Sequence, residues 1–143
     1  MTPETGSLIH ASCVTLNDVG LLIIGSAGSG KSGLALQLMA LGAGLIADDR
    51  VQIAREDDTL IARCPPTISG KIEARQFGVL QVIPIGSTKL HMVVDLDQNP
   101  GSRLPDLKTT SLEGIDLPLI AGKEVPNLSQ ALYVFIRSGA PML

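Results

Sequence analysis

Hydrophobic residues along this chain fall in short runs, and the first three runs predict a strand, a second strand and a helix. Residues 8–16 are apolar and β-branched enough for a strand, and turn residues follow them. Residues 21–24 form a continuous apolar run, which is typical of a strand buried on both faces. Apolar residues then recur at helical spacing across 31–41, with Gly42 and Gly44 as a stop. The front of the chain therefore predicts a strand–loop–helix unit.

The middle of the chain reads mostly as strands. A short apolar strand is expected at 45–47, and two runs at 51–55 and 59–63 flank an acidic turn, as in a hairpin. Further strands are expected at 79–84 and 90–96. Together with the first unit, these runs predict the α/β class, with a mixed sheet that contains antiparallel strands and few helices.

The last third of the chain combines a loop with a helix. Residues 97–116 are polar and contain Pro and Gly, which predicts a long, mobile loop. Residues 127–138 are expected to form a helix, with Asn127 as its N-cap, Gln130 as the capping-box partner and Gly139 beyond its end. With 143 residues, the whole chain 1–143 is expected to be a single domain.

Composition excludes several classes of function. The hydrophobic fraction of 45% is enough for a core and argues against a disordered chain. Aromatic residues make up only 2% of the chain, so base-stacking platforms for single-stranded nucleic acid are not expected. The net charge of −3, without any basic run, argues against a face that binds nucleic acid.

The sequence also predicts no membrane partner. Its apolar stretches are too short to span the ~30 Å of bilayer hydrocarbon, and its N-terminus lacks the pattern of a signal peptide. Cys13 and Cys64 lie far apart, outside any C-x-x-C spacing, as expected of reduced thiols; a disulfide between them is the less favoured alternative. We therefore expect a cytoplasmic protein.

The strongest chemical signal is a complete phosphate-binding loop of the Walker A type, G-x-x-x-x-G-K-[ST], between the second strand and the first helix. Its residues are Gly25, Ser26, Ala27, Gly28, Ser29, Gly30, Lys31 and Ser32. Glycines let backbone N–H groups curl around phosphate oxygens, and the helix N-terminus adds partial positive charge. Lys31 would reach the β- and γ-phosphates, and the Ser32 hydroxyl would bind Mg²⁺. The loop predicts binding of a nucleoside triphosphate; a flexible Gly/Ser turn is the alternative.

Two acidic residues follow the strand expected at 45–47. A helix out and a strand back would return Asp48 and Asp49 to the side of the phosphate loop. One carboxylate could then hold Mg²⁺, and the other could accept the proton of an attacking hydroxyl. The alternative is a solvated acidic turn before the hairpin.

Three further charged residues are weaker candidates on their own. His10 precedes the phosphate loop and could polarise a phosphate or a carboxylate, although lone histidines are more often structural. Glu73 could supply a metal ligand, and Arg75 could supply a guanidinium for a phosphate. A charged surface segment explains Glu73 and Arg75 equally well.

The order of these features resembles the catalytic domain of HPr kinase/phosphorylase, the bacterial enzyme that phosphorylates a serine of the phosphocarrier protein HPr. The features are His10, the phosphate loop, residues 45–51, and residues 72–75 followed by 78–80. The resemblance is good over about residues 8–96 and loose in the last third. It implies a P-loop nucleotide-binding fold related to that of phosphoenolpyruvate carboxykinase, ATP and Mg²⁺ as cofactors, and HPr or an HPr-like carrier as partner. It also implies a homo-oligomer, since the family forms hexamers.

The resemblance further implies roles for individual residues. Asp49 matches the proton acceptor for phosphorylation, which becomes the proton donor in the reverse, phosphorolytic reaction. The other matches to catalytic positions are His10, Lys31 and, in the mobile loop, Arg103. The matches to Mg²⁺ ligands are Ser32 and Glu73, with Asp48 close enough to assist.

Three departures from the family pattern stand out. Only nine residues precede His10, which suggests the short, single-domain form without the family's N-terminal domain. Gln76 follows Arg75 where the family has Gly, and its side chain could narrow the approach to a phosphate. Residues 118–123 lack the arginines of the family's phosphorolysis region, and Lys123 replaces them only in part. Phosphorolysis is therefore more doubtful than the kinase reaction.

The sequence predicts an ATP- and Mg²⁺-dependent serine protein kinase that acts on HPr or an HPr-like carrier. One alternative is a P-loop kinase for a small molecule, which would turn over ATP with a metabolite and not with HPr. The other is a non-catalytic nucleotide sensor, which would bind ATP and a partner protein without making phosphoserine.

Overall fold

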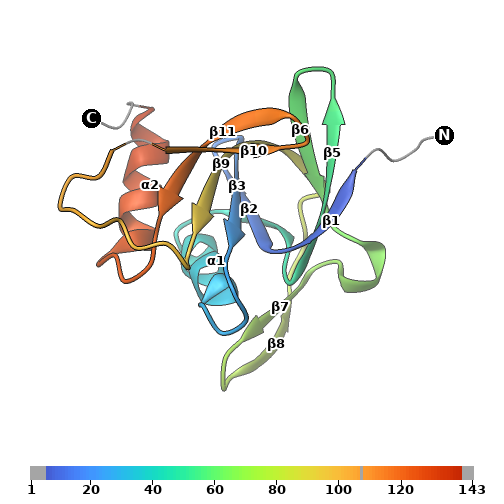
Figure 1. Cartoon of the computed structure of the whole chain (residues 1–143). Helices are drawn as coiled ribbons and strands as arrows, with labels where there is room; N and C mark the ends of the chain where they lie inside the picture. The colour runs from blue at the N-terminus through green and yellow to red at the C-terminus, as the bar shows by residue number, and fades with distance from the viewer. Residues whose placement is uncertain (1–5, 107, 140–143) are drawn as a thin grey trace.

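The computed structural model describes residues 6–106 and 108–139, which form a mixed α/β structure (Figure 1). The strands are β1 (Ser7–His10), β2 (Ser12–Leu16), β3 (Val19–Ile24), β4 (Gly44–Ala47), β5 (Arg50–Glu56), β6 (Thr59–Arg63), β7 (Lys71–Ala74), β8 (Gly78–Gln81), β9 (Ser87–Asp95), β10 (Lys108–Leu112) and β11 (Ile115–Ala121). The helices are α1 (Lys31–Ala40) and α2 (Leu128–Ser138), with a 3-10 turn at Pro66–Ile68. The predicted class, a mixed sheet with few helices, is confirmed.

Most of the strands form one curled sheet. Its order is β1-β5-β6-β9-β3-β2-β4, and the end of β9 also pairs with β11, which carries β10. β3 and β9 run parallel, as do β9 and β11, whereas the other pairs are antiparallel. Because β3 leads into the phosphate loop, this parallel pairing brings the carboxyl end of β9 to the edge where the loop lies.

Two apolar cores flank the sheet, and alternate residues of β3 contribute to each. Leu21 and Ile23 belong to the core that contains Leu34 and Leu38 of α1, whereas Leu22 belongs to the other. This second core is closed by strands β5, β6 and β11. Helices therefore cover one face of the sheet, and the curl of the sheet closes the other.

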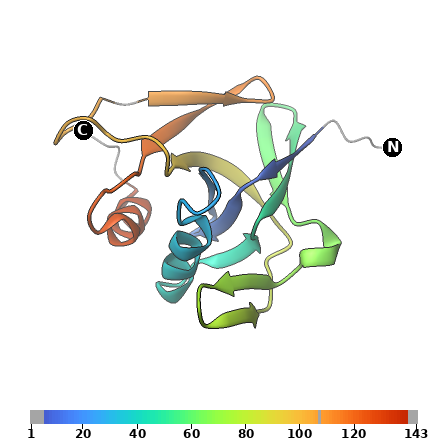
Figure 2. The same cartoon turned by 60° about the horizontal axis from the view of Figure 1, so that its bottom comes forward.

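The two helices lie side by side on the same face of the sheet in both views (Figures 1 and 2). Next to α1 lies the β7–β8 hairpin, a separate two-stranded sheet whose Ile72 packs into the helix-side core. No helix within the described residues has the length and apolar character needed to cross a bilayer. Cys13 and Cys64 are free thiols, as their spacing predicts.

The strand expected at 8–16 is in fact two strands. β1 pairs with β5, whereas β2 pairs with β3 and β4. The chain changes partners at Ala11, whose backbone N–H donates to the carbonyl oxygen of Asp49. A run of apolar residues cannot reveal such a change of partner, because the residues on both sides of it remain strand formers.

The loop expected at 97–116 is shorter than predicted. β10 begins at Lys108 and β11 at Ile115, and a turn at Glu113 and Gly114 with positive φ joins them. Three of the five residues of β10 are exposed and none is fully buried. Its sequence therefore lacks the alternation of apolar and polar residues by which a half-buried strand is recognised.

The remaining helix and hairpin predictions are confirmed, apart from one cap. The helix at 31–41, the hairpin at 51–63 and the C-terminal helix are all present. Asn127 is the N-cap residue, as predicted, but it has a left-handed φ of 56° and its side chain makes no cap hydrogen bond to the described helix. The Ser129 hydroxyl donates to the Gln130 side chain instead. The predicted capping box is wrong, because an N-cap of that kind requires an extended backbone.

Candidate active site

The phosphate loop connects the end of β3 to the first residue of α1. Gly28 and Gly30 have φ values of 82° and 103°, a region that favours glycine. A side chain at Gly25 is also disfavoured, because its φ is 155° and a Cβ there would lie 2.5 Å from the Ser29 hydroxyl oxygen. The loop thus turns tightly and ends at a helix N-terminus, where unpaired N–H groups are available to an anion.

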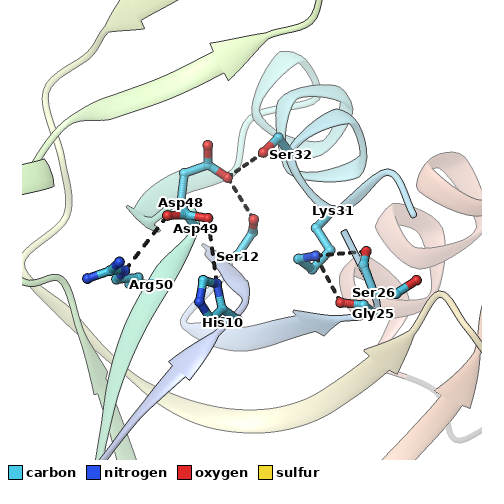
Figure 3. A network of polar contacts seen from close by, with 9 residues as sticks. All are labelled: His10, Ser12, Gly25, Ser26, Lys31, Ser32, Asp48, Asp49 and Arg50. Atoms are coloured by element: carbon cyan, nitrogen blue, oxygen red, sulfur yellow. Dashed lines mark hydrogen bonds and ion pairs between the residues drawn. The ribbon is translucent and has the colours of Figure 1, made fainter. Parts of the chain in front are cut away.

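The Lys31 side chain links the last residues of the phosphate loop to its first residues. Its Nζ atom donates to the carbonyl oxygens of Gly25 and Ser26, at 2.9 and 3.1 Å (Figure 3). These contacts hold the ammonium group over the first residues of the loop. A phosphate that enters the loop therefore meets a positive charge that is already positioned.

Asp48 anchors the second element of the site. Its Oδ1 atom accepts hydrogen bonds from the hydroxyls of Ser12 and Ser32, each at 2.7 Å (Figure 3). Its Oδ2 atom accepts one from the Glu73 backbone N–H at 3.3 Å. Only 7% of Asp48 is exposed. The carboxylate therefore ties the end of β4 to β2, to the phosphate loop and to β7.

Two of the predicted metal ligands, Ser32 and Asp48, contact each other, whereas Glu73 reaches them through its backbone and is otherwise exposed. The described residues contain no group of three or more His, Cys, Asp or Glu that could hold a metal ion. Mg²⁺ commonly takes one or two carboxylates together with substrate phosphates and water. The residues present therefore fit Mg²⁺ bound with a nucleotide rather than a cage made by the protein alone.

Asp49, the next residue, faces solvent. Its side chain is 68% exposed, with His10 Nδ1 at 3.8 Å from one carboxylate oxygen and Arg50 Nε at 3.9 Å from the other. The pairing of β1 with β5 sets His10 opposite Arg50, on either side of this carboxylate (Figure 3). The structure thus brings His10 and Asp49 together, as the resemblance implies.

A hollow of about 390 Å³ connects His10 with the phosphate loop. Its polar lining includes His10, Ser26, Asp95 and Asp97, and its apolar lining comes from β1, β3, β9 and β10. We call this hollow the acidic groove. Among the catalytic candidates only His10 lines it, together with Gly25 and Ser26 at the start of the phosphate loop.

Asp95 and Asp97 are site residues that the sequence reading missed. Asp97 accepts hydrogen bonds from the backbone N–H and the hydroxyl of Ser26, at 2.7 and 2.9 Å. Asp95 ends β9 and accepts a hydrogen bond from the backbone N–H of Asp97 at 2.9 Å. An acidic residue at the end of an apolar strand was the available signal, but it becomes informative only once β9 is known to lie beside β3.

Arg103 is not brought to the phosphate loop. It is exposed, in the segment that follows Asp97, and it lines a separate pocket of about 660 Å³ together with Lys123 and Phe135. That pocket includes no residue of the phosphate loop and neither Asp48 nor Asp49. A catalytic role for Arg103 therefore remains a prediction.

The comparison with protein families decides the relationship of this chain. Residues 3–131 match the family described as HPr Serine kinase C-terminal domain. The chain belongs to this family. The match extends well beyond residues 8–96, where the resemblance is most evident, and includes most of the last third of the chain.

Members of the HPr kinase family among curated proteins and solved structures agree with this assignment. HPr kinase/phosphorylase of Chromobacterium violaceum is 32% identical over 87% of this chain and 46% of its own length. The Aromatoleum aromaticum protein of the same name is 35% identical over 86% of this chain and 45% of its own length. The Hpr(Ser) kinase/phosphatase from Coxiella burnetii superposes with a TM-score of 0.81 at 26% identity, covering 93% of this chain and 95% of that one. The chain thus spans just under half the length of these curated relatives.

One departure from the family pattern now has a structural description. Gln76, at a position where the resemblance leads us to expect Gly, has a φ of 63° in the turn between β7 and β8. Glycine is favoured in that region, so Gln76 adopts a conformation that few side chains tolerate. The residue is exposed.

Proposed function

We propose that this chain is the catalytic domain of an ATP- and Mg²⁺-dependent kinase that phosphorylates a serine of HPr or of an HPr-like carrier protein. The observation that carries the proposal is the contact between Ser32 of the phosphate loop and the buried Asp48, with the exposed Asp49 immediately beyond it. This arrangement supports the proposal, because the phosphate loop lies beside an exposed carboxylate.

The phosphate loop, the start of α1 and Lys31 would bind the triphosphate. Ser32 and Asp48 would hold Mg²⁺ with the assistance of Glu73. When bound, the ion would neutralise charge that develops on the transferred phosphoryl group. The two hydroxyl groups bonded to Asp48 keep its carboxylate oriented toward the loop.

Asp49 would take the proton from the attacking serine hydroxyl. Its carboxylate is accessible, and the cations of Arg50 and, when protonated, His10 lie within 4 Å of it. These neighbours orient the carboxylate without covering it. His10 also faces the acidic groove, so we propose that a substrate serine enters from that side.

Arg103 would contribute only if its loop moves toward the phosphate loop. The loop begins at Asp97, whose carboxylate holds Ser26, so the two segments already share a fixed point. Phosphorolysis is less well supported, because residues 118–123 contain no arginine and Lys123 lies with Arg103 in the pocket away from the site.

Three broader features complete the proposal. The fold would be a P-loop fold related to that of phosphoenolpyruvate carboxykinase, which is consistent with antiparallel strands flanking the β3–β9 pair. The free thiols suit the reducing cytoplasm. Copies of the chain would associate, and the exposed apolar residues Phe77, Val79 and Ile83 in and after the β7–β8 hairpin favour a protein contact there.

The test is formation of phosphoserine on purified HPr with ATP and Mg²⁺. We expect wild-type protein to make it and Asp49→Asn to lose about 10²–10⁴-fold in rate, the usual contribution of a general base. Asp57→Asn is the matched control, because Asp57 is also an exposed aspartate with positive φ, in the turn between β5 and β6. Nucleotide binding without any phosphoserine would contradict the proposal and favour the sensor alternative. Turnover with a small hydroxyl compound alone would favour the small-molecule kinase.

A further inference from the structure

The phosphate loop lies between two hollows of different character. On one side, the acidic groove contains His10, Asp95 and Asp97. On the other side, a groove of about 680 Å³ begins at the loop and runs between the two helices. We call it the α1–α2 groove; its defining residues are Gly30, Gly33, Gln37, Asn127, Leu128 and Gln130.

The α1–α2 groove has the chemistry of a site for an uncharged group. None of the described residues that line it is charged; apolar side chains, amides and hydroxyls make up its walls. Its volume falls within the range of roughly 300–1,000 Å³ that is typical of small-molecule sites. Amides provide both donors and acceptors, so Gln37, Asn127 and Gln130 can pair with the polar edges of a base or with ribose hydroxyls.

The groove is also continuous with the place where phosphates would bind. Ser29 and Gly30 of the phosphate loop form its entrance, and Gly33, Gln37 and Ala40 lie along one face of α1 beyond them. A Cβ at Gly33 would meet no described heavy atom within 4 Å, so the absence of a side chain leaves open space beside the loop. The Ser29 hydroxyl is buried and has no hydrogen-bond partner among the described residues.

From these observations we infer that the α1–α2 groove holds the nucleoside of the bound triphosphate. The inference rests on the proposed function, because it assumes that the loop binds the phosphates. The nucleoside then lies on the opposite side of the loop from His10 and Asp97, which leaves the acidic groove free for the serine substrate. The pocket beside Arg103 is a poorer match, since it carries Arg103, Lys123 and Glu124 and does not touch the phosphate loop.

The test compares ATP with inorganic tripolyphosphate, which offers the phosphates without the nucleoside. We expect wild-type protein to bind Mg²⁺–ATP at least about tenfold more tightly than Mg²⁺–tripolyphosphate, since the groove adds contacts worth ~1.4 kcal/mol or more. Gly33→Leu would fill the groove and should weaken ATP binding by about tenfold, while tripolyphosphate binding stays within about threefold of wild type. Folding should not suffer, because leucine favours a helix more than glycine does.

Two further variants separate the groove from the loop. Gln130→Ala acts from α2 and cannot disturb the loop backbone directly, and it should weaken ATP binding selectively as well. Gly86→Leu is the matched control, because a Cβ at Gly86 also meets no described atom within 4 Å and Gly86 does not line the groove. It should leave the affinity for both ligands unchanged.

The possible outcomes are distinct. Equal affinity of wild type for ATP and tripolyphosphate, or equal weakening of both ligands by Gly33→Leu, would overturn the nucleoside site while leaving phosphate binding by the loop intact. An unchanged affinity for ATP in both Gly33→Leu and Gln130→Ala would overturn it too. A wild-type protein that binds neither ligand would overturn the proposed function itself, and the inference with it.

Discussion

Two consecutive carboxylates, Asp48 and Asp49, are held in opposite ways. Asp48 is buried and accepts three hydrogen bonds, two of them at 2.7 Å, from three different parts of the chain. Asp49 is 68% exposed and, among the described residues, has two ion pairs, at 3.8 and 3.9 Å. The positive φ of Asp49, 76°, turns the chain between β4 and β5, so the two side chains leave the backbone in different surroundings.

Under the proposed function, these two surroundings suit two different tasks within one short turn. A group that holds a metal ion must stay in place, and burial with several donors achieves that. A group that takes a proton must be reached by the second substrate, and exposure achieves that. Two consecutive aspartates after a strand do not reveal which of them is buried and which is exposed. That depends on the left-handed conformation of Asp49 and on the hydrogen bond from Ser12 to Asp48.

The largest expected effect comes from neutralising each of the two carboxylates separately. Asp48→Asn should raise the Mg²⁺ concentration needed for half-maximal activity by at least about tenfold, because Asn removes the charge that attracts the ion. Asp49→Asn should leave that concentration unchanged while it lowers the maximal rate. Titration of kinase activity with Mg²⁺ at saturating ATP measures both quantities.

The two variants are each other's controls. If Asp49→Asn shifted the Mg²⁺ requirement as strongly as Asp48→Asn, the division of roles between the two residues would be wrong. If Asp48→Asn lowered only the maximal rate, Asp48 would act at the transferred proton rather than at the metal.

The second prediction concerns the buried support of Asp48. Ser12 is fully buried, and its hydroxyl donates to the Asp48 carboxylate. Ser12→Ala should lower the free energy of unfolding by about 1.5–3 kcal/mol, as expected for loss of a hydrogen bond to a charged group. Ser111→Ala, at an exposed position of β10, should change it by less than about 0.5 kcal/mol. Denaturant unfolding measures both; equal stability of the two variants would show that Asp48 does not depend on Ser12.

The phosphate loop and its flanking strand and helix were predictable from the sequence, and so was the pair Asp48 and Asp49. In each case the signal is local: a glycine-rich turn needs its residues in a fixed order, a continuous apolar run precedes it, and apolar residues at helical spacing follow it. Family resemblance then added His10 and Glu73, which no local pattern distinguishes from ordinary surface residues.

The remaining features depend on contacts between distant segments. Ser12 lies in an apolar strand and gains its meaning only from Asp48, which is 36 residues away in the sequence. Asp97 likewise becomes part of the site only because β9 runs beside β3. The exposed strand β10 was missed because its polar sequence carries no burial pattern. The periodicity of a sequence indicates which apolar residues are buried. It therefore cannot predict a polar contact between distant segments or an exposed polar strand.

The third prediction concerns Asp97. This residue is exposed, like Asp49, but it makes short hydrogen bonds, like Asp48. Asp97→Asn keeps one acceptor oxygen and replaces the other with an NH2 donor, so both contacts with Ser26 lose the negative charge that strengthens them. The KM for ATP should rise roughly two- to tenfold, the equivalent of one ordinary hydrogen bond. Asp116→Asn, at an exposed position of β11, should leave KM unchanged. A lower kcat with unchanged KM in Asp97→Asn would mean that Asp97 acts on the reaction rather than on the loop.

The smallest expected effect concerns Cys13, whose reactivity would show whether the strands that support Asp48 open. Cys13 follows Ser12 in β2, pairs with Ala47 of β4 next to Asp48, and is fully buried, whereas Cys64 is only partly buried. Burial raises the pKa of both thiols above the ordinary value of 9.0. At mildly alkaline pH, a thiol reagent should therefore modify Cys64 slowly and Cys13 only as fast as the protein unfolds.

The pH dependence of stability follows from the same burial. The raised pKa of Cys13 means that the folded state holds a proton that the unfolded chain releases near pH 9, so this contribution to stability is fully present below pH 9 and is lost as the pH rises beyond it. Cys13→Ala should remove that part of the decline in the unfolding midpoint, while Cys64→Ala should change it less. Fast modification of Cys13 in the folded protein would show that the β2–β4 pair opens locally. The rigid support of Asp48, and with it the contrast between the two carboxylates, would then be wrong.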